Sequence, residues 1–260
     1  MSGLTFFDCN AFIGQVSVPK FFPHRVTPAV LRAEYDRIGV ARGLVTHVAA
    51  KEYSPSVGND LLATELTGGS DHGFLPCLTL LPEQTGESWG PDEVIGRLRA
   101  RGARGVRLFP STAVHRYPFD PRVLGGLFEV LQDARVPVFV DFDLGRRDEA
   151  DWRGLYDITD AFPDLPLVLI RPGGRSDRGL YPLLDRARQV YVETGGYWVH
   201  GGIERLCARF GAHRLLFGSG FPYWTLAGAA YHIATASVED RQKSLIAGEN
   251  LARLLEGARL

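Results

Sequence analysis

The sequence has few of the features that mark disulfide-rich, zinc-binding, membrane-spanning or secreted proteins. It contains three cysteines, Cys9, Cys77 and Cys207, without a CxxC pair or zinc-ribbon spacing, which argues against a disulfide framework and a structural zinc site. Two of them lie in apolar runs, so we expect buried, reduced thiols and a cytoplasmic protein. No apolar run reaches the roughly 18 residues of a membrane helix. No basic region followed by a long apolar stretch opens the chain, so we expect no signal peptide.

Excess charge of either sign is also absent. The formal net charge is −1, which gives no general attraction to nucleic acid or to an anionic membrane. Lys20, Lys51 and Lys243 are the only lysines, so arginine carries most of the positive charge. Its planar guanidinium suits the recognition of carboxylate or phosphate. Among 260 residues, 45% are hydrophobic and 23% charged, as in an ordinary soluble globular protein.

Short apolar runs recur at fairly even intervals along the chain. They cover residues 4–10, 43–50, 73–81, 103–110, 136–143, 165–173, 189–196 and 214–222. Most are nearly continuous rather than alternating, which is typical of strands buried on both faces, as in parallel sheets. Eight such strands, with helices between them, predict an α/β fold, namely a single (β/α)8 TIM barrel over residues 1–260.

Helix signals fill gaps between these runs. Residues 27–39 and 120–134 each open with a capping residue followed by proline. Residues 237–257 begin with Ser237 and Asp240, spaced as in a capping box. A doubly wound open sheet is the competing architecture, but no GxGxxG motif follows the first strand.

Metal-binding motifs are missing as well. The chain has neither HxH nor HExxH, and its seven histidines are scattered. A catalytic zinc ion needs at least three protein ligands drawn from His, Cys, Asp and Glu. The residues alone therefore predict no metal and no other cofactor.

The functional residues of a TIM barrel lie at the carboxyl ends of its strands. The polar and aromatic side chains at those positions that we assign to the site are Asn10, Phe12, Arg107, Asp141, Arg171, Glu193, Tyr197, Ser219, Tyr223 and Trp224. Taken singly, each is well explained as filling for the barrel mouth. Taken together, arginines, carboxylates and aromatic rings indicate a site for a small anionic or aromatic molecule.

Several segments, in their order along the chain, resemble the amidohydrolase superfamily, specifically its amidohydrolase-2 branch of metal-dependent barrel hydrolases and decarboxylases. "FDCNAFIG" is similar to the Asp-x-His-x-His-x-Gly opening of that branch. Later matches are "GARGVRLFP", "VPVFVDFD", "LPLVLIRPGG", "LLFGSGFPYW" and "AGENLARLL". The resemblance implies the barrel fold. It also implies a divalent metal held by the two opening histidines, by histidines on the fifth and sixth strands, and by an eighth-strand aspartate.

This chain departs from the branch at every ligand position. The matching residues are Asn10, Phe12, Asp141, Arg171 and Gly220. Of these only Asp141 is a good metal ligand, because Asn binds weakly, Phe and Gly offer no donor, and Arg is a permanent cation. We expect a dismantled metal site, in which Arg107, Arg171 or both pair with Asp141.

Three function classes remain open at this stage. The first is a metal-independent hydrolase (lactonase-like) or decarboxylating lyase. In it, Arg107 and Arg171 bind a carboxylate, Asp141 or Glu193 acts as general acid or base, and Asn10 donates to an oxyanion. The second is a pseudoenzyme that binds a ligand or a partner protein. The third is a metallohydrolase with unorthodox ligands. Barrels of this branch often form dimers, so a homodimer is a further expectation, and residues 16–25 are expected to form a lid or a dimer contact.

Overall fold

The computed structural model describes residues 3–17, 25–67, 72–144 and 149–260. Most of the segment expected to form a lid or dimer contact, residues 18–24, lies outside the described residues. In the part that is described, the predicted TIM barrel is confirmed. Its parallel strands are β1 (Phe6–Gln15), β3 (Val40–His47), β4 (Phe74–Thr79), β5 (Gly105–Leu108), β6 (Val138–Val140), β7 (Leu167–Leu169), β8 (Val190–Glu193) and β9 (Leu215–Leu216).

The sheet runs in the order β2-β1-β3-β4-β5-β6-β7-β8-β9 and closes on itself. Strand β2 (Arg25–Val26) is a short antiparallel addition to the end of β1. Closure comes from backbone hydrogen bonds between β1 and the segment after β9. The Cys9 N–H donates to Phe217 O (3.0 Å), the Gly220 N–H to Asn10 O (2.7 Å), and the Phe12 N–H to Phe221 O (2.9 Å). Closing the sheet leaves its barrel strands without an open edge.

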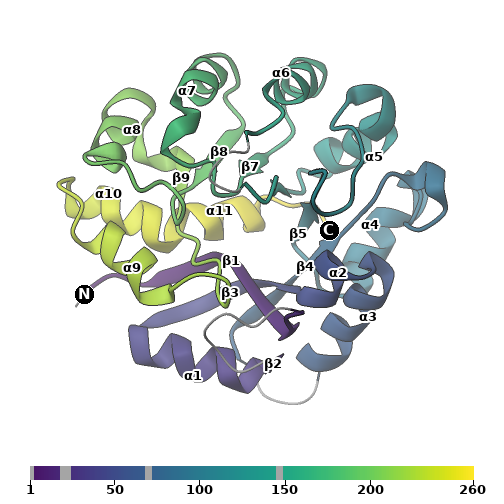
Figure 1. The fold of residues 1–260 in the computed structure, drawn as a ribbon, viewed down its shortest axis with the longest axis horizontal. Coiled ribbons are helices and arrows are strands. Elements are labelled where there is room, and N and C mark those ends of the chain that lie inside the picture. The colour runs from purple at the N-terminus through teal and green to yellow at the C-terminus, as the bar shows by residue number, and fades with distance from the viewer. Residues whose placement is uncertain (1–2, 18–24, 68–71, 145–148) are drawn as a thin grey trace.

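Helices surround the strands as an outer ring (Figure 1). They are α1 (Pro28–Ile38), α2 (Val48–Glu52), α3 (Pro55–Leu66), α4 (Pro91–Ala100), α5 (Pro121–Asp133), α6 (Trp152–Ala161), α7 (Asp177–Arg186), α8 (Gly202–Phe210), α9 (Leu226–Ala234), α10 (Asp240–Ser244) and α11 (Asn250–Glu256). Short 3-10 turns occur at Glu83–Thr85, Gly174–Ser176 and Ala212–Arg214. No helix in the described ranges is long and apolar enough to span a membrane.

Two of the predicted helices begin as their capping residues indicate. Thr27 accepts a hydrogen bond from the Val30 N–H ahead of α1, and Asp120 accepts one from the Arg122 N–H ahead of α5. In each case proline occupies the first helical position, where its missing N–H costs no hydrogen bond.

The prediction for residues 237–257 is wrong in two respects. The capping box uses Glu239 and Gln242 rather than Ser237 and Asp240, because the Ser237 N–H donates instead to Glu204 (2.6 Å). The helix is also interrupted by a π turn, η4 (Leu245–Glu249), between α10 and α11. At this turn the Ile246 carbonyl accepts a hydrogen bond from the Phe217 N–H (2.9 Å), which ties the turn to the barrel wall.

The barrel interior is apolar at its amino-terminal end and polar nearer the mouth. At the apolar end, side chains from the strands pack with leucines of α11 in one cluster, which includes Phe7, Cys9, Cys77, Phe139, Leu216, Leu251 and Leu254. Residues two apart on a strand point to the same side. Phe139 on β6 therefore contributes to the apolar floor, and Asp141 projects from the same side of the chain one step closer to the mouth.

Candidate functional site

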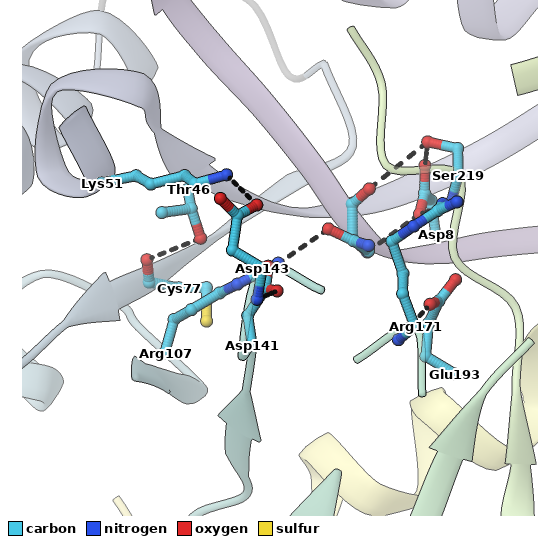
Figure 2. A network of polar contacts seen from close by, with 11 residues as sticks. Asp8, Thr46, Lys51, Cys77, Arg107, Asp141, Asp143, Arg171, Glu193 and Ser219 are labelled. Atoms are coloured by element: carbon cyan, nitrogen blue, oxygen red, sulfur yellow. Dashed lines mark hydrogen bonds and ion pairs between the residues drawn. The ribbon is translucent and has the colours of Figure 1, made fainter. Parts of the chain in front are cut away.

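Arg107 is the central residue of the barrel mouth. It lies on β5 and is only 1% exposed. Its Nη1 donates to Asn10 Oδ1 (2.9 Å) and its Nη2 donates to Asp141 Oδ2 (2.5 Å), so one guanidinium joins β1 to the end of β6 (Figure 2). The Arg107 Cζ also lies 4.8 Å from the centre of the Phe12 ring. One buried cation thus contacts three of the five residues at which the family resemblance implies metal ligands.

Asp141 is buried, and both of its carboxylate oxygens accept hydrogen bonds. Oδ2 accepts from Arg107, and Oδ1 accepts from the Asp143 N–H (2.9 Å). Burial opposes ionisation of Asp141, but the charges of Arg107 and Lys51, with these hydrogen bonds, hold its pKa below the ordinary value. Lys51, on α2, pairs with Asp143 at 2.7 Å. Asp141 is therefore an ionised partner of Arg107, as the expected pairing requires.

Arg171 follows β7 and is held differently. Its backbone has a φ of 49°, in the left-handed region that non-glycine residues rarely adopt. Its Cζ lies 4.2 Å from the centre of the Trp224 ring, and Trp224 is 54% exposed. The Nη1 atom of Arg171 is buried and has no hydrogen-bond partner among the described residues. Of the two arginines expected to pair with Asp141, the described contacts give that role to Arg107, and Arg171 retains a free donor.

Glu193 ends β8 and is fully buried. Its Oε1 accepts from the Gly195 N–H (2.7 Å) and its Oε2 accepts from the Arg171 N–H (2.9 Å). Burial is the largest influence and raises the pKa of Glu193 to about 7, although the Arg171 charge and the two amides act in the opposite direction. A carboxyl group with this pKa exchanges its proton near neutral pH, which is the property that acid–base catalysis uses.

Ser219 takes part in closing the barrel. Its N–H donates to Asp8 Oδ1 (2.9 Å), and its hydroxyl donates to Asp8 Oδ2 (2.5 Å). The same carboxylate accepts from the Asn10 N–H (2.9 Å) and from the Tyr35 hydroxyl (2.8 Å). Asp8 is fully buried, and burial raises its pKa. The hydroxyl of Ser219 is thus engaged in a link between β1 and the segment after β9.

Sequence reasoning missed Asp8 and Tyr35. The available signal was a carboxylate inside the apolar run of residues 4–10, which is costly to bury unless several donors satisfy it. The sequence did not indicate that Tyr35, on the buried side of α1, supplies one of them.

The remaining predicted site residues fall into two places. Tyr223 lies at the mouth, where its ring meets Phe12 edge-on at 5.3 Å and its hydroxyl donates to Glu52 Oε1 (2.6 Å). Tyr197 is buried elsewhere, with its hydroxyl donating to Asp177 on α7 (2.6 Å). The hydrogen bonds of Tyr197 therefore lead toward α7, and no described contact joins it to either arginine.

The residues at the family's ligand positions do not fit a divalent metal. The side-chain oxygen of Asn10 and one oxygen of Asp141 already accept from Arg107, whose fixed charge would repel a cation bound beside it. In the part of the chain that the structure describes, no group of three or more His, Cys, Asp or Glu side chains is arranged to hold a metal ion.

Comparison with solved structures gives matches to whole barrels. The 5-carboxyvanillate decarboxylase from Sphingomonas paucimobilis is 17% identical with a TM-score of 0.69, over 98% of this chain and 99% of that one. The 2,6-dihydroxybenzoate decarboxylase from Rhizobium is 14% identical with a TM-score of 0.75, over 98% and 99%. A putative 2-pyrone-4,6-dicarboxylic acid hydrolase from Pseudomonas putida is 16% identical with a TM-score of 0.72, over 98% of both chains. At these identities the likeness establishes the fold.

Membership of a family rests on a separate comparison. No curated protein sequence matches the chain significantly. A family model described as amidohydrolase matches residues 20–257, which is most of the chain. The protein therefore belongs to the amidohydrolase family.

Proposed function

We propose that this protein binds a small aromatic carboxylate at the barrel mouth and acts on it as a metal-independent hydrolase or lyase. The observation that carries the proposal is the position of Arg107, whose buried guanidinium bridges Asn10 and Asp141. The chain itself supplies the positive charge at this place, where buried acceptor oxygens need a charged donor. The proposal retains the barrel of the family and assigns the chemistry to the protein's own acid–base groups.

Arg171 is the proposed anchor for the carboxylate. Its buried Nη1 is a charged donor without a partner among the described residues, and such a group is costly unless a ligand satisfies it. A guanidinium binds carboxylates with paired, charge-assisted hydrogen bonds. The exposed part of the Trp224 ring offers apolar surface beside it. The names of similar structures, decarboxylases of aromatic acids and a pyrone dicarboxylic acid hydrolase, support a ligand of this class.

Glu193 is the proposed general acid or base. Its pKa of about 7 lets it hold or release a proton under physiological conditions, whereas Asp141 is kept ionised by Arg107. Because Arg107 has only donors to offer, the side-chain oxygen of Asn10 must face it. The Asn10 amide nitrogen is then the group left to donate to a developing oxyanion.

A pseudoenzyme that binds the same ligand without converting it is the second candidate. One observation favours it: both oxygens of Asp141 and both oxygens of Glu193 already accept hydrogen bonds within the protein. These bonds occupy one lone pair on each oxygen and favour the ionised form, so they weaken both carboxylates as bases.

Replacing Arg171 with alanine tests the anchor. A thermal-shift screen of aromatic acids, lactones and phosphorylated metabolites should find stabilising acids with the natural protein. Arg171→Ala should weaken their binding roughly 10- to 100-fold, the effect of losing a charged hydrogen-bond pair. Arg178→Ala, at an exposed position on α7, should bind as the natural protein does.

Mass spectrometry of the incubated ligands then separates the two candidates. Conversion that Arg171→Ala abolishes and Arg178→Ala preserves supports the enzyme. A ligand that binds tightly and is recovered unchanged after long incubation supports the pseudoenzyme. If no acid in the screen stabilises the natural protein, the proposed ligand class is wrong.

Binding of an aromatic acid should weaken as the pH rises above about 7. Below that pH Glu193 is protonated, and its negative charge no longer acts on the Arg171 guanidinium. Above it the ionised Glu193 competes with the ligand, and affinity should fall by up to about tenfold per pH unit. Benzoate, which stays ionised over this range, is a suitable probe for calorimetric titration from pH 5 to 9. Glu193→Gln should remove the dependence, and a profile that Glu193→Gln leaves unchanged would contradict the assignment.

We further propose that the protein works in the cytoplasm as a homodimer. The three cysteines are buried and free, which suits a reducing compartment. The dimer follows from the family resemblance, and light scattering on the purified protein tests it.

A further inference from the structure

Gly220 lies directly beneath the contact between Arg171 and Trp224. Its φ is 70°, and a Cβ atom added there would lie 3.0 Å from Arg171 Nη1 and 2.9 Å from Trp224 Cδ1. The Gly220 carbonyl also accepts the backbone N–H of Trp224 (3.1 Å). Glycine at this position therefore leaves the space that the guanidinium and the indole fill together.

A second glycine limits the base of the Arg171 side chain. A Cβ atom at Gly196 would lie 2.8 Å from Arg171 Cβ and 3.0 Å from its Cα. The Arg171 N–H is held by Glu193 (2.9 Å), and its left-handed backbone is a conformation that persists only where surrounding contacts enforce it. The position of the Arg171 side chain is thus fixed by its neighbours on several sides.

We propose that Arg171, Trp224 and Gly220 form one seat for the carboxylate of a planar, unsaturated acid, with Gly220 as its positioning residue. The inference deepens the proposed function and rests on it. Trp224 covers one face of the guanidinium, and the unpartnered Nη1 lies in its plane, where a carboxylate accepts hydrogen bonds from an arginine. A flat ligand can then extend beside the indole, whereas a puckered ring would meet it less closely.

The seat also links two departures from the family's ligand pattern, at positions 171 and 220. An aspartate at position 220 would bring a Cβ atom to 3.0 Å from Arg171 Nη1, and its carboxylate would neutralise the guanidinium. An acidic residue at 220 would therefore crowd the present position of Arg171 and engage its charge. A glycine at 220 is the complement of an arginine at 171, and it keeps the charge of that arginine available to a ligand.

Gly220→Ala tests the seat, with Gly86→Ala as its matched control. Gly86 has a φ of 72° and nothing within 4 Å of an added Cβ atom, so both variants carry the same backbone strain and only Gly220→Ala crowds a neighbour. In urea Gly220→Ala should lose at least as much stability as Gly86→Ala, because it adds crowding to the same backbone strain. Only Gly220→Ala should bind benzoate at least about tenfold more weakly, because the anchoring arginine is displaced. In the natural protein, benzoate should bind more tightly than cyclohexanecarboxylate, its puckered counterpart.

Modification of Arg171 by phenylglyoxal, followed by peptide mass analysis, gives a readout that needs no ligand. Gly220→Ala should increase the modification rate, and Gly86→Ala should leave it unchanged. Trp224→Ala, which removes a half-exposed ring, should also increase the rate and serves if Gly220→Ala does not fold. If Gly220→Ala folds and its modification rate is unchanged, the proposed seat is wrong. If Gly220→Ala does not fold, an unchanged rate in Trp224→Ala has the same meaning. An increased rate in a protein that never binds benzoate keeps the packing role of Gly220 but overturns the ligand assignment and the proposed function.

Discussion

Replacing Arg107 with methionine should lower the free energy of unfolding by about 3–5 kcal/mol at neutral pH, the usual cost of leaving one partner of a buried ion pair alone. Methionine keeps much of the arginine's apolar volume, although the cation that lies over the Phe12 ring is lost with the guanidinium. What is lost is the charge that holds Asp141 ionised and the donor that satisfies Asn10. Urea unfolding, followed by tryptophan fluorescence, measures the difference.

The pH dependence identifies the cause of that loss. In the natural protein the lowered pKa of Asp141 stabilises the fold above its ordinary value of 3.8, and the contribution disappears as the pH falls through the lowered value. Without Arg107, burial is opposed only by the Lys51 charge and the Asp143 N–H, so the pKa of Asp141 should rise. The destabilisation in Arg107→Met should therefore be largest near pH 7 and smaller near pH 4.

Asp141→Asn supplies the control and completes a double-mutant cycle. It leaves the Arg107 charge buried without a carboxylate, so it too should destabilise the protein. Its loss of stability, unlike that of Arg107→Met, should not become smaller near pH 4. The double variant Arg107→Met with Asp141→Asn should lose much less than the sum of the single losses, because neither charge remains unpaired. Additive losses, or a loss in Arg107→Met that is the same at pH 4 and pH 7, would contradict the pairing.

Replacing Asp8 with alanine should destabilise the protein by roughly 3–5 kcal/mol, because four donors lose their shared acceptor inside the barrel wall. Two of those donors belong to Ser219, so the loss falls on the closure between β1 and the segment after β9. Hydrogen exchange of the Cys9, Phe12 and Gly220 amides, which bridge the closure, should become faster.

Tyr35→Phe is the graded comparison for that experiment. It removes a single donor to Asp8, and no acceptor is left buried and unsatisfied on the tyrosine side, so the expected loss is about 1 kcal/mol. A loss in Asp8→Ala no greater than in Tyr35→Phe would mean that the carboxylate does not secure the closure.

The free energy of unfolding should also depend on pH through Glu193. The folded protein keeps this proton up to about pH 7, whereas the unfolded chain releases it near the ordinary pKa of 4.5. Its contribution to folding is therefore fully present below pH 4.5 and is lost as the pH rises to about 7. Glu193→Gln should remove that slope, as comparison of unfolding curves between pH 4.5 and 7.5 would detect.

The architecture could be predicted because it depends on local patterns. Nearly continuous apolar runs identified the barrel strands, and Thr27 and Asp120 marked the starts of two helices through their own hydrogen bonds. The helix over residues 237–257 was predicted less well because its π turn depends on a bond from Phe217, just after β9, to Ile246. A contact of that kind leaves no periodic trace in the sequence.

The site could be predicted only as a set of neighbouring strand ends. Adjacent strands brought Arg107 and Arg171 near Asp141, and pairing of a guanidinium with that carboxylate was expected. Which arginine pairs depends on the left-handed backbone at Arg171 and on Trp224, neither of which strand order reveals. Tyr197 was assigned to the ligand-binding site by position alone, and its position could not show that its hydroxyl donates to Asp177.

The central claim is that the guanidinium of Arg107, held by Asn10 and Asp141, takes the place at which related barrels hold a metal ion. Elemental analysis tests it most directly. The protein would be purified without chelators or metal-affinity steps, equilibrated with Zn²⁺ or Mn²⁺, and desalted. Because the donors at the family's ligand positions are too few for a catalytic metal, bound metal should remain far below one equivalent. One equivalent of metal that the natural protein retains and Asp141→Asn loses would contradict the claim.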